Sequence, residues 1–146
     1  MTTVYATFVV EDRFLGLPVG RVREVLRAQP LTPVPLAHPD ISGLLNLRGQ
    51  IVTAVDLRAR LHLPPRDAGE PSAHVVVTTQ HAPVSLVVDR LGDVLAVDEA
   101  TFEPPPDTLD PHARPLIKGA FKFDDALLLE LDLDGTLDLT TDLEHV

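Results

Sequence analysis

Residues that could carry catalysis are few in this chain, and they do not occur at the spacings that catalysis uses. None of the three serines, Ser42, Ser72 and Ser85, lies in the G-x-S-x-G context that exposes a serine nucleophile. The six histidines never occur four residues apart or in H-E-x-x-H, the pattern of a helix-borne zinc site. Glycine-rich phosphate loops and cysteines are absent. The sequence therefore predicts no cofactor, no metal and no enzymatic activity.

The carboxylates leave one enzymatic alternative open. Asp56, Asp89 and Asp132 each end a predicted strand and are the candidate acids of a small hydrolase, although a solvent-facing aspartate is ordinary at a strand end. A hydrolase predicts a carboxylate pair that converges in a pocket with a raised pKa. A binding protein predicts an apolar surface and no such pair.

A second acidic pattern resembles a calcium loop without completing it. Glu130, Asp132, Asp134 and Gly135 occupy the first, third, fifth and sixth positions, but the twelfth, which should be a glutamate, is Thr141. The acids also alternate with leucines, which favours a pleated strand over a loop that wraps an ion.

Composition limits the class of protein further. The chain has 146 residues, 45% of them hydrophobic, so it is long enough for one domain with a core. Its net charge of −10 repels nucleic acid and anionic lipid, and 4% aromatic residues offer little for base stacking. No leader-like start and no apolar run of membrane-spanning length is visible. We expect a soluble cytoplasmic chain with no nucleic-acid partner and no membrane insertion.

Fourteen prolines and eight glycines divide the chain into short segments, as in a many-stranded β protein. Alternating or short apolar runs predict strands at 4–11, 14–19, 50–57, 74–79, 84–88, 94–97, 117–123 and 126–133. This pattern, with roughly eight to ten strands and no strand–helix–strand crossover, is typical of a sandwich or small barrel.

Other segments are predicted to turn or coil. Val22, Val25 and Leu26 are three and four residues apart, which predicts a helical turn at 22–26. We expect a leucine-rich turn at 41–47, a short helix at 57–61, exposed proline-rich loops at 64–72 and 103–111, and a helical turn between 135 and 146. Asp12–Arg13 and Asp124–Asp125 are the predicted turns of the first and last hairpins.

Several motifs occur in an order that together points to one family. They are T-P-V-P at 32–35, L-L-N-L-R-G-Q-I-V-T-A-V-D-L-R at 44–58, V-R-E-V at 22–25, L-V-V-D-R-L at 86–91 with D-V-L at 93–95, F-E-P-P-P at 102–106, and I-K-G at 117–119. In these motifs, over nearly its whole length, the chain resembles the CheW family of chemotaxis coupling proteins.

The resemblance implies an all-β fold of two intertwined five-stranded SH3-like barrels with short helical turns, forming a single CheW-like domain over residues 1–146. It implies a non-enzymatic adaptor that joins the cytoplasmic tips of chemoreceptors to the regulatory domain of the histidine kinase CheA, recruited to membrane-associated receptor arrays. A variant within the family, an accessory protein that binds only one of these partners, stays open.

The resemblance also implies a receptor-binding groove between the barrels. Its positions map here to Ala6, Val19, Val22 and Leu91. An apolar stripe at a barrel junction is what a helical receptor tip needs to lie against. The alternative for Val22 and Val25 is that they belong to the core.

Two polar residues match positions that the family uses in coupling, Glu24 and Arg48. Glu24 is otherwise a solvated carboxylate. Arg48 precedes Gly49 at a tight corner, where its guanidinium could instead hydrogen-bond to loop carbonyls and fix the turn.

Overall fold

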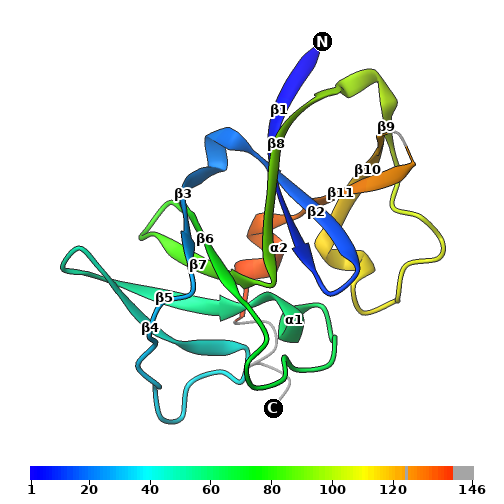
Figure 1. Cartoon of the computed structure of the whole chain (residues 1–146). Coiled ribbons are helices and arrows are strands. Elements are labelled where there is room, and N and C mark those ends of the chain that lie inside the picture. Colours follow the sequence, from blue (N-terminus) through cyan, green and yellow to red (C-terminus); the bar gives the residue numbers. More distant parts are fainter. Residues whose placement is uncertain (124, 140–146) are drawn as a thin grey trace.

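The computed structural model describes residues 1–123 and 125–139, and it is built from two antiparallel-rich sheets (Figure 1). The first sheet has the order β8-β1-β2-β11-β10-β9, with β1 (Thr2–Val10), β2 (Arg13–Pro18), β8 (Arg90–Asp98), β9 (Phe102–Glu103), β10 (Ile117–Phe123) and β11 (Ala126–Leu131). The second has the order β3-β6-β7-β5-β4, with β3 (Val22–Arg27), β4 (Ile41–Leu47), β5 (Gln50–Asp56), β6 (Ala73–Val77) and β7 (Val84–Val88). The predicted all-β fold is confirmed.

Each sheet curls back on itself, so we call them the first and second barrels. The end strands of the first sheet, β8 and β9, are consecutive in the chain and are separated only by the 3₁₀ turn η2 (Glu99–Thr101). In the second sheet the segment after β3 returns to pair with β4 through the Thr32–Leu44 bridge. The second barrel comes from the middle of the chain and the first from its two ends, so the barrels are intertwined.

Short helical elements lie at the junctions of the strands. They are α1 (Leu57–Arg60), α2 (Leu133–Leu137), η1 (Val19–Arg21) and η3 (Arg114–Leu116). Asp56 caps α1 by accepting a hydrogen bond from Arg58 N, and Asp132 caps α2 by accepting one from Gly135 N. Within the described ranges no helix is both long and apolar enough to cross a lipid bilayer.

The largest apolar cluster joins the two barrels. It takes Phe8 and Leu15 from the first sheet and Val75 and Leu86 from the second, all fully buried. Smaller clusters lie within each barrel, around Phe121 in the first and around Leu45, Leu47, Val52 and Val76 in the second. The barrels therefore pack as one unit through a common core.

Two predicted turns are wrong, because the structure forms strands there. Residues 22–27 form β3, which pairs antiparallel with β6, and residues 41–47 form β4, which pairs with β5. In the 41–47 segment the apolar side chains also alternate, with Leu45 and Leu47 buried and Asn46 exposed between them. Pairing with a neighbouring strand satisfies the backbone along the whole segment, which an isolated helical turn cannot do.

The other boundaries differ by a few residues. The first hairpin turns at Glu11–Asp12 rather than Asp12–Arg13, because Val10 pairs with Arg13 and Glu11 adopts a left-handed φ of 56°. The predicted C-terminal helical turn is seen earlier, as α2, and the part of that prediction beyond residue 139 lies outside the described residues, as does Asp124.

Candidate functional site

An apolar patch lies on the outer face of the strand pair β1 and β8, which run side by side in Figure 1. Val4 is 40% exposed, Leu91 38% and Val94 65%, and Ala6 is partly exposed between them. Ala6 is directly opposite Val94, and residues opposite each other in an antiparallel pair share a face. We call Val4, Ala6, Leu91 and Val94 the β1/β8 patch.

The patch continues the common core of the two barrels. Along β1, side chains alternate between the barrel interior and its outer face. Phe8 and Val10 point from the outer face into the common core, whereas Val4 and Ala6 lie on the same face beyond the cover of the second barrel. Leu91 pairs with Phe8, so the patch begins where the core ends.

The predicted groove residues do not all lie in this patch. Ala6 and Leu91 lie together in the patch. Val19, 41% exposed, begins η1 directly after Pro18, which pairs with Tyr5 of β1. Val22, in contrast, is partly buried and packs against the common core.

Val25 also departs from its predicted place. Residues 22–27 form a strand and not the predicted helical turn, but a β-bulge between Val22 and Glu24 places Val22 opposite Val77 and Val25 opposite Val75, so the two valines lie on the same face. Val25 is 47% exposed, so the alternative that it is a core residue is wrong.

Glu24 and Arg48 lie together at the mouth of the second barrel. Arg48 Nη2 donates to both carboxylate oxygens of Glu24, at 2.6 and 2.8 Å. The alternative role for Arg48 was to fix the turn by hydrogen-bonding to loop carbonyls. Its guanidinium is instead paired with Glu24. The turn is held instead by Asn46, whose side chain accepts from Gly49 N at 2.9 Å.

The backbone at Arg48 is unusual for this residue type. Arg48 and Gly49 join β4 to β5 in a two-residue turn, and their φ angles are 52° and 86°. Two left-handed residues are the hairpin geometry that favours Asn-Gly, and a left-handed arginine costs about 1 kcal/mol. The strained position holds Arg48 beside Glu24, which argues for a role of the side chain beyond the turn.

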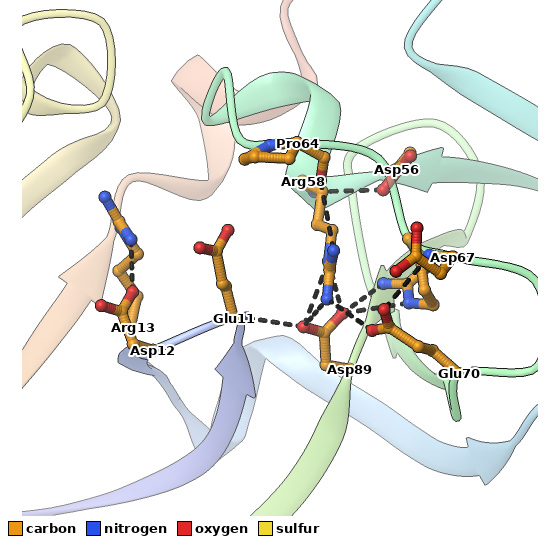
Figure 2. A network of polar contacts seen from close by, with 10 residues as sticks. Glu11, Asp12, Arg13, Asp56, Arg58, Pro64, Asp67, Glu70 and Asp89 are labelled. Carbon is orange, nitrogen blue, oxygen red and sulfur yellow. Dashed lines mark hydrogen bonds and ion pairs between the residues drawn. The ribbon is translucent and has the colours of Figure 1, made fainter.

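A buried charge cluster fixes the point where the chain passes from the second barrel to the first (Figure 2). Asp89 lies between β7 and β8, and its carboxylate accepts hydrogen bonds from the side chains of Arg58 and Arg66 and from Glu11 N. Arg58 also donates to Glu70, so the cluster holds the loop after α1 as well. We call Arg58, Arg66 and Asp89 the junction cluster.

Electrostatics of the junction cluster keep Asp89 ionised. Burial alone would raise the pKa of Asp89, but the hydrogen bonds from Arg58, Glu11 N and Arg66 outweigh it and hold the pKa at about 2. The same pairing raises the pKa of Arg58. Asp89 is therefore a fixed anion that ties together two barrels and a loop.

The carboxylate pair of a hydrolase is not formed by the three candidate aspartates. Asp89 is held by arginines, while Asp56 and Asp132 cap α1 and α2. Burial raises the pKa of Asp56, and the charge of Arg66 partly offsets it. No group of three potential metal ligands occurs among residues 1–123 and 125–139.

The acids of the calcium-like pattern border a surface hollow of about 400 Å³ beside η1. Glu130 accepts a hydrogen bond from the Tyr5 hydroxyl at 2.7 Å, and Asp134 pairs with Arg21. Burial and the Glu130 hydrogen bond raise the pKa of Tyr5. These acids are paired within the fold, and Asp132 caps α2, so the segment forms a strand and a helix cap rather than a loop around an ion.

Sequence reasoning missed the most exposed member of the patch. The sequence predicts Val94 only as part of a short strand, and Val4 as part of a half-buried one. Their shared face depends on the pairing of β1 with β8, which are more than eighty residues apart in the chain.

Comparisons with known proteins agree on one family. A model of the CheW-like domain matches residues 5–140. The chain is 29% identical over 131 residues to chemotaxis protein CheW of Bacillus subtilis, covering 90% of this chain and 84% of that protein. It is 32% identical over 131 residues to chemotaxis protein CheW of Rhizobium meliloti, covering 88% and 83%.

A solved structure supports the same relation. The fold matches the scaffolding protein TtCheW of Thermoanaerobacter tengcongensis with a TM-score of 0.84 and 28% identity, over 95% of this chain and 94% of that one.

Proposed function

This chain belongs to the CheW-like family of chemotaxis scaffold proteins, which are adaptors and not enzymes, and from that membership we propose that it couples chemoreceptor tips to the histidine kinase CheA. In this proposal the 1–146 chain acts as one CheW-like domain of two barrel subdomains. It is recruited to receptor arrays at the cytoplasmic side of the membrane.

The observation that carries the receptor half of the proposal is the β1/β8 patch. Its side chains form a continuous apolar surface beside the barrel junction, and no element of the described chain covers Val94. A helical receptor tip presents apolar residues every three or four positions and fits such a surface. Val19 borders the patch at the end of β2 and extends it toward the second barrel.

The kinase half of the proposal rests on the Glu24–Arg48 pair. This pair lies on the second barrel. Two exposed apolar residues are near it in the chain: Val25 follows Glu24 on β3, and Ile51 is on β5, just after the turn that contains Arg48. A charged pair beside apolar side chains gives orientation and affinity at once. Because the patch lies on the first barrel, both partners can bind together.

A charge placed in the patch tests the receptor half. We expect Val94→Glu to remain folded, because the side chain is 65% exposed, and to lose co-sedimentation with receptor cytoplasmic fragments. Val22→Glu is a poorer test, because Val22 packs against the common core and a charge there destabilises the fold.

The matched control is Leu36→Glu, which makes the same kind of change at a fully exposed residue outside the patch. Leu36→Glu should co-sediment like the unmodified protein. Equal co-sedimentation of Val94→Glu and Leu36→Glu would contradict the assignment of the patch. Binding of receptor without CheA would instead identify the accessory variant of the family.

A further inference from the structure

Strand β8 contains one residue more than its partner in the middle of the patch. Ala6 pairs with Val94 and Phe8 pairs with Leu91, so Gly92 and Asp93 together lie opposite the single residue Thr7. This is a β-bulge, which bends a strand and re-aims its side chains.

The bulge decides which way Leu91 points. Side chains three apart on a regular strand point to opposite faces, so Leu91 and Val94 could not both face outward. With regular pairing from Val94 onward, Leu91 would lie opposite Val9 and point into the first barrel. The extra residue moves it opposite Phe8, onto the outer face, where it is 38% exposed.

Thr7 pins the bulge from inside the barrel. Thr7 is buried, and its hydroxyl donates to the carbonyl oxygen of Asp93 at 2.5 Å. Gly92 fits against it because a Cβ there would collide with Thr7 Oγ1 and lie 3.2 Å from the Thr7 carbonyl oxygen. Being buried, Thr7 is shielded from any partner on the outer face.

The extra residue is confined between two fixed points. Before it, Asp89 N donates to Val9 O at 3.0 Å and the Asp89 carboxylate binds Glu11 N. After it, Val94 pairs with Ala6. The bulge must therefore lie somewhere within 90–94, and the Thr7 hydroxyl is the contact that holds it at Gly92 and Asp93.

We propose that Thr7 and Gly92 are positioning residues of the receptor-binding surface, because the bulge they fix turns Leu91 out of the barrel and into the β1/β8 patch. This inference rests on the proposed function for its consequence in binding. Its structural part, the direction of Leu91, is independent of any partner.

The direction of Leu91 can be measured by chemical labelling, since the chain has no cysteine of its own. Leu91→Cys and Val94→Cys are each combined with Thr7→Val, which keeps the shape but removes the hydroxyl, and with Thr7→Ser, which keeps the hydroxyl. We expect Thr7→Val to slow maleimide labelling at position 91 about threefold or more relative to position 94, as the freed bulge shifts toward Asp89 and turns this side chain inward. Thr7→Ser should leave that ratio unchanged.

Binding is measured on the variants without cysteine. We expect Thr7→Val to weaken binding to a receptor cytoplasmic fragment about tenfold through loss of one apolar anchor, with Thr7→Ser restoring it. Thr3→Val, which removes another hydroxyl from the same strand, is the matched control and should bind normally. Thermal unfolding checks that each variant is folded, and Gly92→Ala replaces Thr7→Val if that variant unfolds.

The outcomes separate the inference from the function it rests on. An unchanged labelling ratio in Thr7→Val, or equal slowing in Thr7→Ser, overturns the inference. Slowed labelling with unchanged receptor binding confirms the bulge but overturns the patch as the receptor site. If the unmodified protein binds no receptor fragment, the proposed function fails, while labelling still decides the direction of Leu91.

Discussion

Asp89 shows how a single buried carboxylate can hold a molecule together. Its carboxylate accepts hydrogen bonds from the side chains of Arg58 and Arg66 and from the backbone of Glu11. These partners come from α1, from the loop after α1 and from the first hairpin. Removing one partner from such a cluster leaves the others buried without a counter-charge, which is more costly than losing a surface pair.

We predict that Asp89→Asn lowers the free energy of unfolding by about 3 kcal/mol, because two arginines lose their anionic acceptor. Urea unfolding at pH 7 measures this. Asp12→Asn, an exposed carboxylate in the neighbouring turn, is the control and should change stability by less than about 1 kcal/mol. Equal effects of the two substitutions would contradict the importance of the cluster.

The low pKa of Asp89 also predicts an acid dependence of stability. The folded-state value of about 2 lies below the ordinary 3.8, so the stabilisation is complete well above pH 4 and is lost as the pH falls toward 2. Between pH 6 and pH 3 the unmodified protein should lose about 1 kcal/mol more than Asp89→Asn. Parallel losses in urea unfolding at the two pH values would rule this out.

His74 predicts a second pH dependence, near neutrality. It is buried on β6 with its Nδ1 2.8 Å from Ser85 Oγ, and burial, assisted by Arg66, lowers its pKa below 6.5. The unfolded chain therefore binds a proton more readily, and stability falls as the pH drops below about 6.5. We expect His74→Asn to remove this fall, seen as a flatter urea midpoint from pH 7 to 5. His81→Asn, at an exposed histidine, should keep it.

At the scale of elements, the turn between β4 and β5 combines a strained backbone with Arg48, which we propose contacts the kinase. We predict that Arg48→Asn changes the free energy of unfolding by less than about 1 kcal/mol, because relief of the left-handed arginine offsets loss of the exposed Glu24 pair. Binding to CheA should nevertheless fall about tenfold in a pull-down titration, and Glu24→Gln should do the same. Arg27→Asn, on the same strand as Glu24, is the charge-matched control; kinase binding by Arg48→Asn at the level of Arg27→Asn would refute the role of the pair.

The elements also show why part of the structure was readable from sequence and part was not. The hairpin of β6 and β7 consists of two short, largely apolar runs separated by a turn, so its residues predict it directly. The spacing of Val22, Val25 and Leu26 fits a helical turn better than a regular strand, and the segment pairs with β6 only through a β-bulge between Val22 and Glu24, which the sequence does not reveal.

The candidate site was less predictable than the fold. Family resemblance supplied Ala6 and Leu91, but the bulge interrupts the period of two that marks a strand, so β8 was expected only over 94–97. The junction cluster brings Arg58 to Asp89 across thirty-one residues, which no local pattern indicates.

At the scale of the whole molecule, the common core predicts that the two barrels unfold together. Leu86 of the second sheet and Phe8 of the first belong to one buried cluster, so neither barrel keeps a complete core alone. Fluorescence of Tyr5, the single tyrosine in a chain without tryptophan, reports the first barrel, and amide exchange of β6 and β7 reports the second. We expect one transition by both probes, and Leu86→Ala should lower its free energy by about 3 kcal/mol. Two separate midpoints would mean that the barrels are independent.

The same architecture separates the two binding surfaces that we propose. The β1/β8 patch lies on the first barrel and the Glu24–Arg48 pair on the second, and the common core holds the two barrels together. A rigid connection of this kind lets one partner be held at a fixed place relative to the other. Simultaneous engagement then raises the effective concentration of each partner at the other's site.

The central claim is that this protein binds receptor and CheA at the same time, and bridging of the two tests that claim most directly. The measurement is the amount of CheA that sediments with receptor cytoplasmic assemblies in the presence of this protein. We predict that the unmodified protein brings CheA down, that Val94→Glu stays in solution bound to CheA, and that Arg48→Asn sediments with receptor but leaves CheA behind. Sedimentation of CheA in equal amounts with the unmodified protein, with either variant and with no adaptor would contradict it.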